Sequence, residues 1–148
     1  MSSDSTSDLE IAKKELKENN LNLVIAKYGK IIFSTDEDGV RGLVRAIDNY
    51  ARDMYGSSVA DTVVGKAAAM LCSYAKVSSV YGGLMSINGR NFLIRRGIDS
   101  EYEKLVEEIL NRERRDICPF ERLVKDCNDV REAYGKIKSF LLTQRKPI

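Results

Sequence analysis

Residues 58–75, S-V-A-D-T-V-V-G-K-A-A-A-M-L-C-S-Y-A, decide the fold that the sequence predicts. Ser58 and Asp61 have the spacing of helix-capping residues, so we expect a helix that starts near Val59. A rotation of 100° per residue places one broad apolar face on this helix and a second, narrow stripe of small side chains. A helix with two such faces is predicted to lie inside the protein.

Gly65 stands in the middle of this predicted helix, where a glycine costs about 1 kcal/mol relative to alanine. It therefore indicates that another backbone, or a ligand, approaches closely. The pair Gly65-Lys66 is reminiscent of a phosphate loop, but Ala60 and Ala67 occupy positions where that motif requires Gly and Ser or Thr. The predicted helix also places Lys66 beyond the free amides that bind phosphate. Lys66 is either a solvated lysine or a ligand contact.

Size and charge limit the classes of protein to consider. A chain of 148 residues suits a single domain. Its 24 Lys and Arg against 22 Asp and Glu give a net charge of +2, so nucleic acid is not an expected partner. The sequence has neither an apolar run long enough to span a membrane nor a signal peptide. We expect a cytoplasmic protein with no membrane partner.

The cysteine and histidine content narrows the possible chemistry. Cys72, Cys118 and Cys127 are an odd number at irregular spacing, which favours reduced thiols. The chain has no histidine, which excludes Ser-His and Cys-His catalytic pairs and any zinc bound by histidine. We therefore expect neither a metal nor another cofactor.

The rest of the chain predicts alternating elements around the central helix. Residues 1–8 read as a disordered leader, 9–143 as one domain and 144–148 as a frayed tail. The turn Tyr28-Gly29 is typical of a β-hairpin. The expected elements are helix 9–19, strands 21–27 and 30–35, helix 40–54, strand 79–86, helix 88–96 capped by Asn88 and closed by Gly97, and a short strand followed by helix in 98–111. This order predicts a three-layer α/β/α fold with a mixed sheet and an N-terminal β-hairpin.

Two further helices are expected near the C-terminus, and the first raises a question of chemistry. Pro119 suits a first helical turn, which makes Cys118 the N-cap, and Asp129 opens the last helix. A thiol at a helix N-terminus, close to Arg112 and its neighbouring arginines, is predicted to have a lowered pKa. Cys118 is thus a candidate nucleophile, and the alternative is a buried structural cysteine.

Two other places are candidates for ligand contact. Asp61, in the first turn of the predicted central helix, is either a partner for a ribose hydroxyl, a general base, or half of a capping box. Gly82 and Gly83 lie in the middle of a predicted buried strand, where they indicate a bulge or a close approach to the backbone.

The motifs S-V-A-D-T-V-V-G-K-A-A-A, V-Y-G-G, N-R and C-P-F-E, in this order, support a resemblance over residues 21–141. The chain resembles a family of small prokaryotic proteins that share a domain of unknown function and a fold similar to that of cytidine deaminases. Deaminases of that superfamily carry a His/Cys-x-Glu motif at the central helix and a Pro-Cys-x-x-Cys motif after the next strand. By order in the chain these fall near residues 61–63 and 86–89, where this sequence has no ligand and no glutamate.

The resemblance implies a deaminase-like scaffold that has lost its zinc, with a pocket that binds a nucleotide or an ADP-ribose-like ligand. The site residues expected for this small-molecule partner are Asp61, Lys66, Gly82, Gly83, Ser86, Asn88, Asn111 and Arg112. One alternative is an enzyme, a transferase or a redox protein, with Cys118 as the reactive thiol. A second alternative is a homodimeric assembly module.

Overall fold

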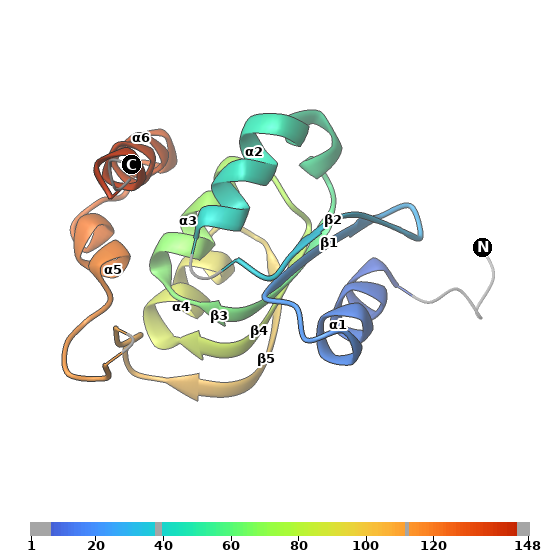
Figure 1. Ribbon diagram of the computed structural model, residues 1–148, viewed down its shortest axis with the longest axis horizontal. Coiled ribbons are helices and arrows are strands. Elements are labelled where there is room, and N and C mark those ends of the chain that lie inside the picture. The colour runs from blue at the N-terminus through green and yellow to red at the C-terminus, as the bar shows by residue number, and fades with distance from the viewer. Residues whose placement is uncertain (1–6, 38–39, 112, 145–148) are drawn as a thin grey trace.

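The computed structural model describes residues 7–37, 40–111 and 113–144, which form a five-stranded sheet between layers of helices (Figure 1). The strands are β1 (Leu23–Lys27), β2 (Lys30–Thr35), β3 (Ser58–Val64), β4 (Ser79–Ser86) and β5 (Asp99–Val106). Their order in the sheet is β2-β1-β3-β4-β5, with β1 antiparallel to both neighbours and β3, β4 and β5 parallel. The predicted three-layer α/β/α fold with a mixed sheet is confirmed.

The hairpin between β1 and β2 has the predicted two-residue turn. Tyr28 and Gly29 both have positive φ, 54° and 76°, as a tight hairpin turn requires. Their amides donate hydrogen bonds to the two carboxylate oxygens of Asp8, at 3.1 and 2.8 Å. The first helix is thereby tied to the tip of the hairpin.

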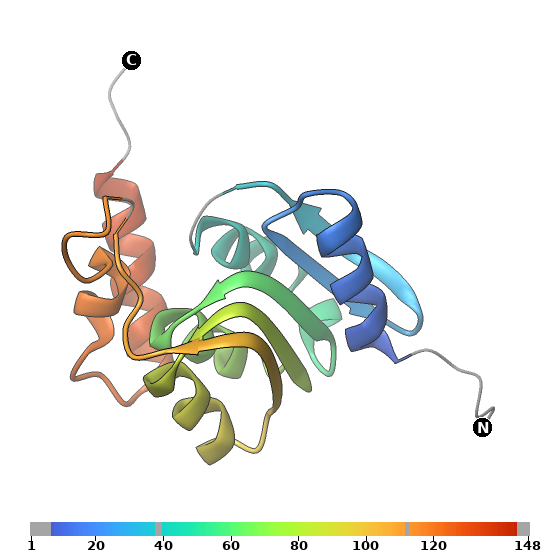
Figure 2. The same cartoon turned by 90° about the horizontal axis from the view of Figure 1, so that it is seen from below.

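Helices cover both faces of the sheet, and they are distributed unequally (Figure 2). Helix α1 (Asp8–Glu18) covers one face, where Leu9, Ala12 and Leu16 pack against side chains of β1, β3 and β4. The other face is covered by α2 (Arg41–Met54), α3 (Lys66–Tyr74) and α4 (Ile87–Arg95). The larger core lies on this second side, between the sheet and α3.

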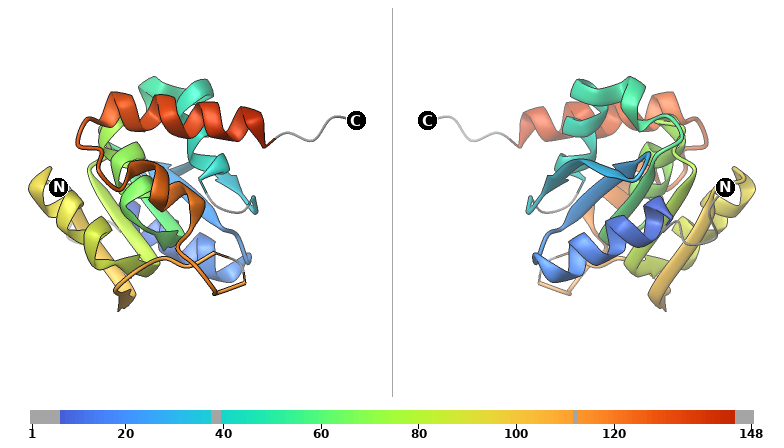
Figure 3. Two further views of the ribbon diagram at one scale, coloured as in Figure 1. Left: turned by 90° about the vertical axis from the view of Figure 1, so that its left-hand side faces the viewer. Right: turned by 90° about the vertical axis from the view of Figure 1, so that its right-hand side faces the viewer.

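Two C-terminal helices add a further layer outside α3. Helix α5 (Pro119–Val124) and helix α6 (Val130–Thr143) both pack on α3, and α6 crosses it to reach α2 (Figure 3). Asp129 caps α6 as predicted, accepting hydrogen bonds from the amides of Arg131 and Glu132. Every side of α3 is therefore covered by other elements, as its alanine-rich sequence indicates.

The predicted helix over 58–75 is wrong in its first half, because residues Ser58–Val64 form the central strand β3. Four of these seven residues, Val59, Thr62, Val63 and Val64, are β-branched, which favours a strand. A central parallel strand is buried on both faces and shows no alternation, so its pattern resembles that of a buried helix. Gly65 is the N-cap of α3, the junction between the two elements.

Two other predictions also need correction. Residues Asp99–Val106 form the edge strand β5 throughout, with no helix after its start, because their backbone pairs in register with β4. The N-cap of α4 is Ser86, whose hydroxyl accepts from the Gly89 amide at 2.9 Å, and Asn88 lies in the first turn instead. Gly97, with φ of 72°, ends this helix as predicted.

The expected leader and tail fall largely on residues 1–6 and 145–148, which lie outside the described residues. Ser7 and Asp8, assigned to the leader from the sequence, belong to the domain: Ser7 caps α1 and Asp8 is its first residue. In the described part of the chain, no helix combines the length and the apolar character that crossing a bilayer requires.

Candidate functional site

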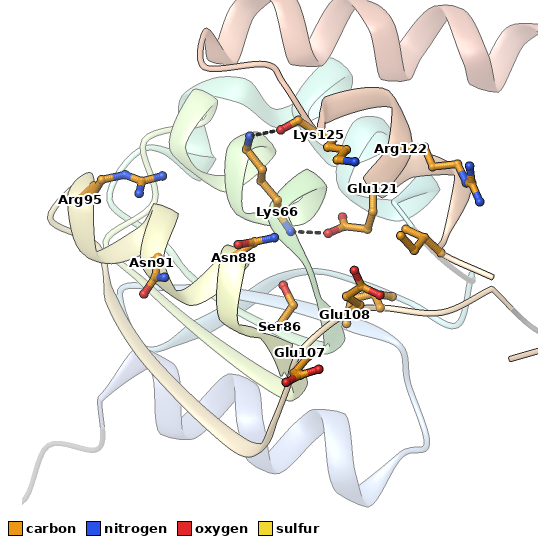
Figure 4. Close-up of a pocket in the computed structure, with 12 residues that line it drawn as sticks. Lys66, Ser86, Asn88, Asn91, Arg95, Glu107, Glu108, Glu121, Arg122 and Lys125 are labelled. Carbon is orange, nitrogen blue, oxygen red and sulfur yellow. Dashed lines mark hydrogen bonds between the residues drawn. The ribbon is translucent and has the colours of Figure 1, made fainter. Parts of the chain in front are cut away.

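A pocket of about 420 Å³ opens where the three parallel strands end and the helices α3 and α4 begin (Figure 4). Ser86 ends β4, Lys66 begins α3, and Glu107 follows β5 directly. The residues that line it are Lys66, Ser86, Asn88, Asn91, Arg95, Glu107, Glu108, Ile109, Ile117, Glu121, Arg122 and Lys125. Ligands of open α/β sheets bind at this end of the strands, so this is the candidate site.

Helix α4 contributes three polar side chains from one face. Asn88, Asn91 and Arg95 are spaced at i, i+3 and i+7 and all line the pocket. Within the described residues, the two carboxamides have no hydrogen-bond partner and the guanidinium has no carboxylate partner. Asn88 is among the site residues expected from the sequence, and the helical spacing from Asn88 also points to Asn91 and Arg95.

Two glycines let the starts of α3 and α4 come together at the base of the pocket. A Cβ on Gly89 would lie 2.9 Å from the carbonyl carbon of Gly65, so only glycine fits there. Ser86, 1% exposed, holds this turn through its hydrogen bond to the Gly89 amide. The arrangement places Ser86 and Asn88 beside Lys66.

The start of α3 is closed by a carboxylate from a distant part of the chain. The two carboxylate oxygens of Glu121, in α5, accept hydrogen bonds from the amides of Lys66 and Ala67, each at 2.8 Å. A Cβ on Gly65 would lie 2.5 Å from this carboxylate, so the close approach predicted at Gly65 is the approach of Glu121. Burial raises the pKa of Glu121, against the opposing effect of the two amides.

Lys66 is the first residue of α3, and its predicted position deep inside a helix is wrong. Its backbone amide binds Glu121, and its ammonium donates to the carbonyl oxygen of Lys125 at 3.0 Å. The first and last turns of α5 are thus both fastened to the start of α3. In the sequence, the close approach expected at Gly65 was the one signal of this contact, and it did not identify Glu121.

Asp61 does not line the pocket. It lies on β3, 6% exposed, and its carboxylate accepts from the Val63 amide at 3.2 Å. Burial raises the pKa of Asp61 to about 7. Cys72 lies close enough that, besides its own burial, the charge of Asp61 raises the pKa of its thiol. The predicted roles of Asp61 in a helix start, as cap or ribose partner, do not fit this position.

The remaining predicted ligand residues are spread over several places. Gly82 is buried in β4, where a Cβ would lie 3.0 Å from the Val64 side chain, and Gly83 lies against the Thr62 carbonyl oxygen. Asn111 begins a turn, and its backbone amide donates a hydrogen bond to the Asp116 carbonyl oxygen at 2.8 Å. Arg112 lies outside the described residues. Of the eight expected residues, the structure brings Lys66, Ser86 and Asn88 together in the pocket.

Cys118 occupies the predicted N-cap position of α5, with Pro119 at the first helical position. The predicted lowering of its pKa is wrong, because burial raises the pKa of this thiol and the carboxylate of Glu121 raises it further. The amides of Phe120 and Glu121 act in the opposite direction with smaller effect. The thiol thus lacks the stabilised thiolate that a nucleophilic cysteine needs.

The residues at the two helix starts do not fit a hydrolytic zinc centre. The start of α3 has Gly65 and Lys66, and the start of α4 has Ser86, Asn88 and Gly89, so no thiolate or imidazole is offered. The one carboxylate between the helices, that of Glu121, is held by two backbone amides. Over the described ranges, no group of three or more His, Cys, Asp or Glu is placed to hold a metal ion.

Comparisons with known proteins agree with this architecture. A crystal structure of a DUF1893 family protein from Thermotoga maritima superposes with a TM-score of 0.83 at 25% identity, over 92% of each chain. A dCMP deaminase from the cyanophage S-TIM5, in its apo form, superposes with a TM-score of 0.50 at 15% identity, over 63% of this chain and 97% of that one. This second likeness shows the fold alone. No curated protein sequence matches the chain.

The family model for a domain of unknown function, DUF1893, matches residues 11–141. This range runs from α1 to α6 and includes every described residue of the pocket. The chain therefore belongs to the DUF1893 family and has a deaminase-like fold.

Proposed function

We propose that the pocket binds a nucleotide-type small molecule and does not carry out zinc-dependent deamination. The observation that carries the proposal is the row of Asn88, Asn91 and Arg95 on one face of α4, in a pocket of about 420 Å³. Small-molecule sites have volumes of roughly 300–1,000 Å³ and a few convergent polar groups. A carboxamide offers a donor and an acceptor side by side, which matches the edge of a nucleobase.

The other lining residues suit the remaining parts of such a ligand. Ile109 and Ile117 provide apolar surface for a planar base. Glu107 and Glu108, both exposed, are acceptors for the hydroxyl groups of a ribose. With Lys66, Arg95, Arg122 and Lys125 against three glutamates, the lining carries a formal charge of about +1, which suits a ligand of low negative charge.

Glu121 determines where a phosphate group would bind. The free amides at the start of a helix are a common phosphate site, but here Glu121 accepts from two of them. Another anion at that point would be repelled by the carboxylate. We therefore place the phosphate at the outer side of the pocket, near Arg95 and Lys125, which have no carboxylate partner among the described residues.

The comparisons support the proposal at the level of the scaffold. The cyanophage protein is named a dCMP deaminase, and the present chain has a similar fold. The present pocket lies at the end of the parallel strands where α3 and α4 start. By order in the chain the deaminase motifs fall near residues 61–63, in the strand that leads into α3, and 86–89, at the start of α4. The lack of thiolates and imidazoles at these helix starts supports binding without the zinc-dependent reaction.

A thermal-shift panel followed by calorimetry tests the proposal. The panel contains cytidine, adenosine, their 5′-phosphates, ADP-ribose and inorganic phosphate. At least one nucleotide should raise the Tm in proportion to the logarithm of its concentration. Asn88→Ala should weaken its binding about tenfold, the equivalent of one lost hydrogen bond.

Asn128→Ala is the matched control, because Asn128 is exposed and is not one of the residues that line the pocket. This variant should bind the selected nucleotide with the affinity of the wild type. Equal loss in both variants, or no response to any member of the panel, would contradict the proposal. Release of ammonia from cytidine would contradict its second half.

A further inference from the structure

A second and larger concavity, of about 1,100 Å³, lies at the opposite end of the parallel strands from the pocket. It is a groove between the last turns of α2 and α3 and the first turn of α6, with the ends of β1 and α4 at its sides. Its lining residues are Lys27, Ile47, Asp48, Ala51, Arg52, Tyr55, Ser73, Tyr74, Ala75, Lys76, Arg96, Val130, Arg131 and Tyr134. It shares no lining residue with the pocket, and we call it the basic groove.

The charge of the basic groove is strongly one-sided. It contains five cations, Lys27, Arg52, Lys76, Arg96 and Arg131. Within the described chain none of the five has a carboxylate at ion-pair distance. The single acidic lining residue, Asp48, already accepts from Lys138 at 2.9 Å and from the Tyr134 hydroxyl. A chain with a net charge of only +2 thus gathers five unbalanced cations at one place.

Helix dipoles account for only part of this gathering. Cations near helix C-termini are stabilised by the helix dipole, which explains Arg52, Lys76 and Arg96 at the ends of α2, α3 and α4. It does not explain Lys27, at the end of a strand, or Arg131, in the first turn of α6. The first turn of a helix is an unfavourable place for a cation. Helix dipoles therefore do not account for these two cations, of which Lys27 also lies over the Tyr28 ring, 5.2 Å from its centroid.

The basic groove also offers aromatic surface beside its charges. Tyr55, which directly follows α2 and lines the groove with Arg52, is 63% exposed. Tyr74 and Tyr134, which also line the groove, are stacked with ring centroids 4.8 Å apart. Cations that track a phosphate backbone, together with an exposed ring on which a base stacks, are the features of single-strand nucleic-acid sites.

We propose that the basic groove binds single-stranded nucleic acid, with phosphates on its five cations and a base stacked on Tyr55. Its volume of about 1,100 Å³ is at the upper end of the range typical of small-molecule pockets, and its cations are spread over β1, α2, α6 and the residues that follow α3 and α4. Both features favour an extended chain of phosphates over a mononucleotide. In a duplex the bases are stacked on each other and are not available to Tyr55.

Fluorescence anisotropy with a labelled single strand of about 12 nucleotides tests the inference, a length within the range of known single-strand sites. Binding should be clear at low salt and should weaken as salt rises. The double variant Arg52→Ala, Lys76→Ala should lose about tenfold in affinity and show a smaller salt slope, by roughly 0.7 per lost phosphate contact. Tyr55→Ala should weaken binding without changing the salt slope, and Tyr55→Phe should restore it.

Two controls make the result specific. Arg41→Ala with Lys14→Ala removes the same charge from exposed positions outside the basic groove and should leave affinity unchanged. Asn88→Ala should also bind the strand normally, so failure of the pocket proposal and of this one can be told apart. Equal loss in the charge-matched control, equal affinity for a duplex, or competition by AMP at the same concentration as the strand would overturn the inference, as would no binding at low salt.

Discussion

At the scale of single residues, the contact between Gly65 and Glu121 joins the fold to the candidate site. The glycine leaves room for a carboxylate that arrives from 56 positions along the chain and closes the start of α3. A side chain at position 65 would displace this carboxylate from two amides. The contact is therefore testable by substitution at either end.

We expect Gly65→Ala to lower the free energy of unfolding by about 1–3 kcal/mol, because the new methyl group displaces Glu121 from its two hydrogen bonds. In a Glu121→Ala background the same substitution should cost much less, since the bonds are already lost. Urea denaturation of the four proteins of this cycle measures the coupling. If the losses of unfolding free energy in the two single variants add up to that of the double variant, the contact is contradicted. Gly135→Ala, in α6 with open space around the glycine, is the control and should be neutral or slightly stabilising.

Asp61 predicts a pH dependence of stability. Burial raises the pKa of Asp61 from its ordinary 3.8 to about 7, so between these values the folded protein binds a proton that the unfolded chain has lost. Stability should therefore fall as pH rises from about 4 to about 7, by up to about 1.4 kcal/mol per pH unit. Asp61→Asn should remove this component, whereas Asn in place of the exposed Asp53 should not. Denaturation of both variants at pH values from 5 to 8 measures how the free energy of unfolding depends on pH. The same dependence in Asp61→Asn as in the wild type would show that Asp61 is not its source.

At the scale of elements, the junctions between neighbours decide how the sheet is covered. Helix α1 is the only helix of the described chain on its face of the sheet, and Asp8 joins it to the hairpin turn. On the other face, α5 is held to α3 by Glu121 and by the bond from Lys66 to the Lys125 carbonyl oxygen. Both junctions rest on charged groups that bind backbone atoms.

Asp8→Ala should destabilise the protein by about 1 kcal/mol, because it removes the acceptor for the Tyr28 and Gly29 amides. Glu10→Ala is the matched control, since Glu10 lies in the same first turn and its side chain pairs, among the described residues, with the half-buried Lys13, which keeps Glu101 as a partner. It should change stability by less than about 0.5 kcal/mol. Thermal denaturation of the two variants separates the hairpin contact from the dipole of α1. Equal effects would show that the dipole alone is responsible.

The element boundaries show where sequence patterns suffice and where they fail. The hairpin, α1, α2, β4, α4 and the Asp129 cap of α6 follow from turn chemistry and periodicity, and the structure confirms them. Strand β3 was mistaken for helix because a strand buried on both faces has no alternation to reveal it. The second half of β5 was expected to be helical, because its strand conformation depends on pairing with β4, which no local pattern encodes.

At the scale of the whole molecule, the two candidate sites lie at opposite ends of the parallel strands. The pocket collects side chains from α3, α4, α5 and the segment after β5, and the basic groove collects them from α2, α3, α6 and the ends of β1 and α4. Three residues of the pocket, Lys66, Ser86 and Asn88, were expected from the sequence, although Lys66 was placed inside a helix and Asn88 at a helix cap. The sequence could not predict Glu121, Lys125 or the basic groove, because these depend on how α5 and α6 pack on α3.

The low net charge also shows a limit of composition. A value of +2 argues against a protein that is basic throughout, but it does not describe how charges are distributed. Here the pocket has three glutamates, Glu107, Glu108 and Glu121, among four cations, while the basic groove has five cations and one aspartate. Only the folded chain separates these two environments.

Hydrogen–deuterium exchange with and without the best nucleotide of the panel tests the central proposal most directly, because it locates the bound ligand on the chain. We predict slower exchange at the start of α4, in the segment that follows β5 and at the start of α5, which together line the pocket. No slowing in these segments at a nucleotide concentration that raises the Tm, or slowing confined to the basic groove, would contradict it.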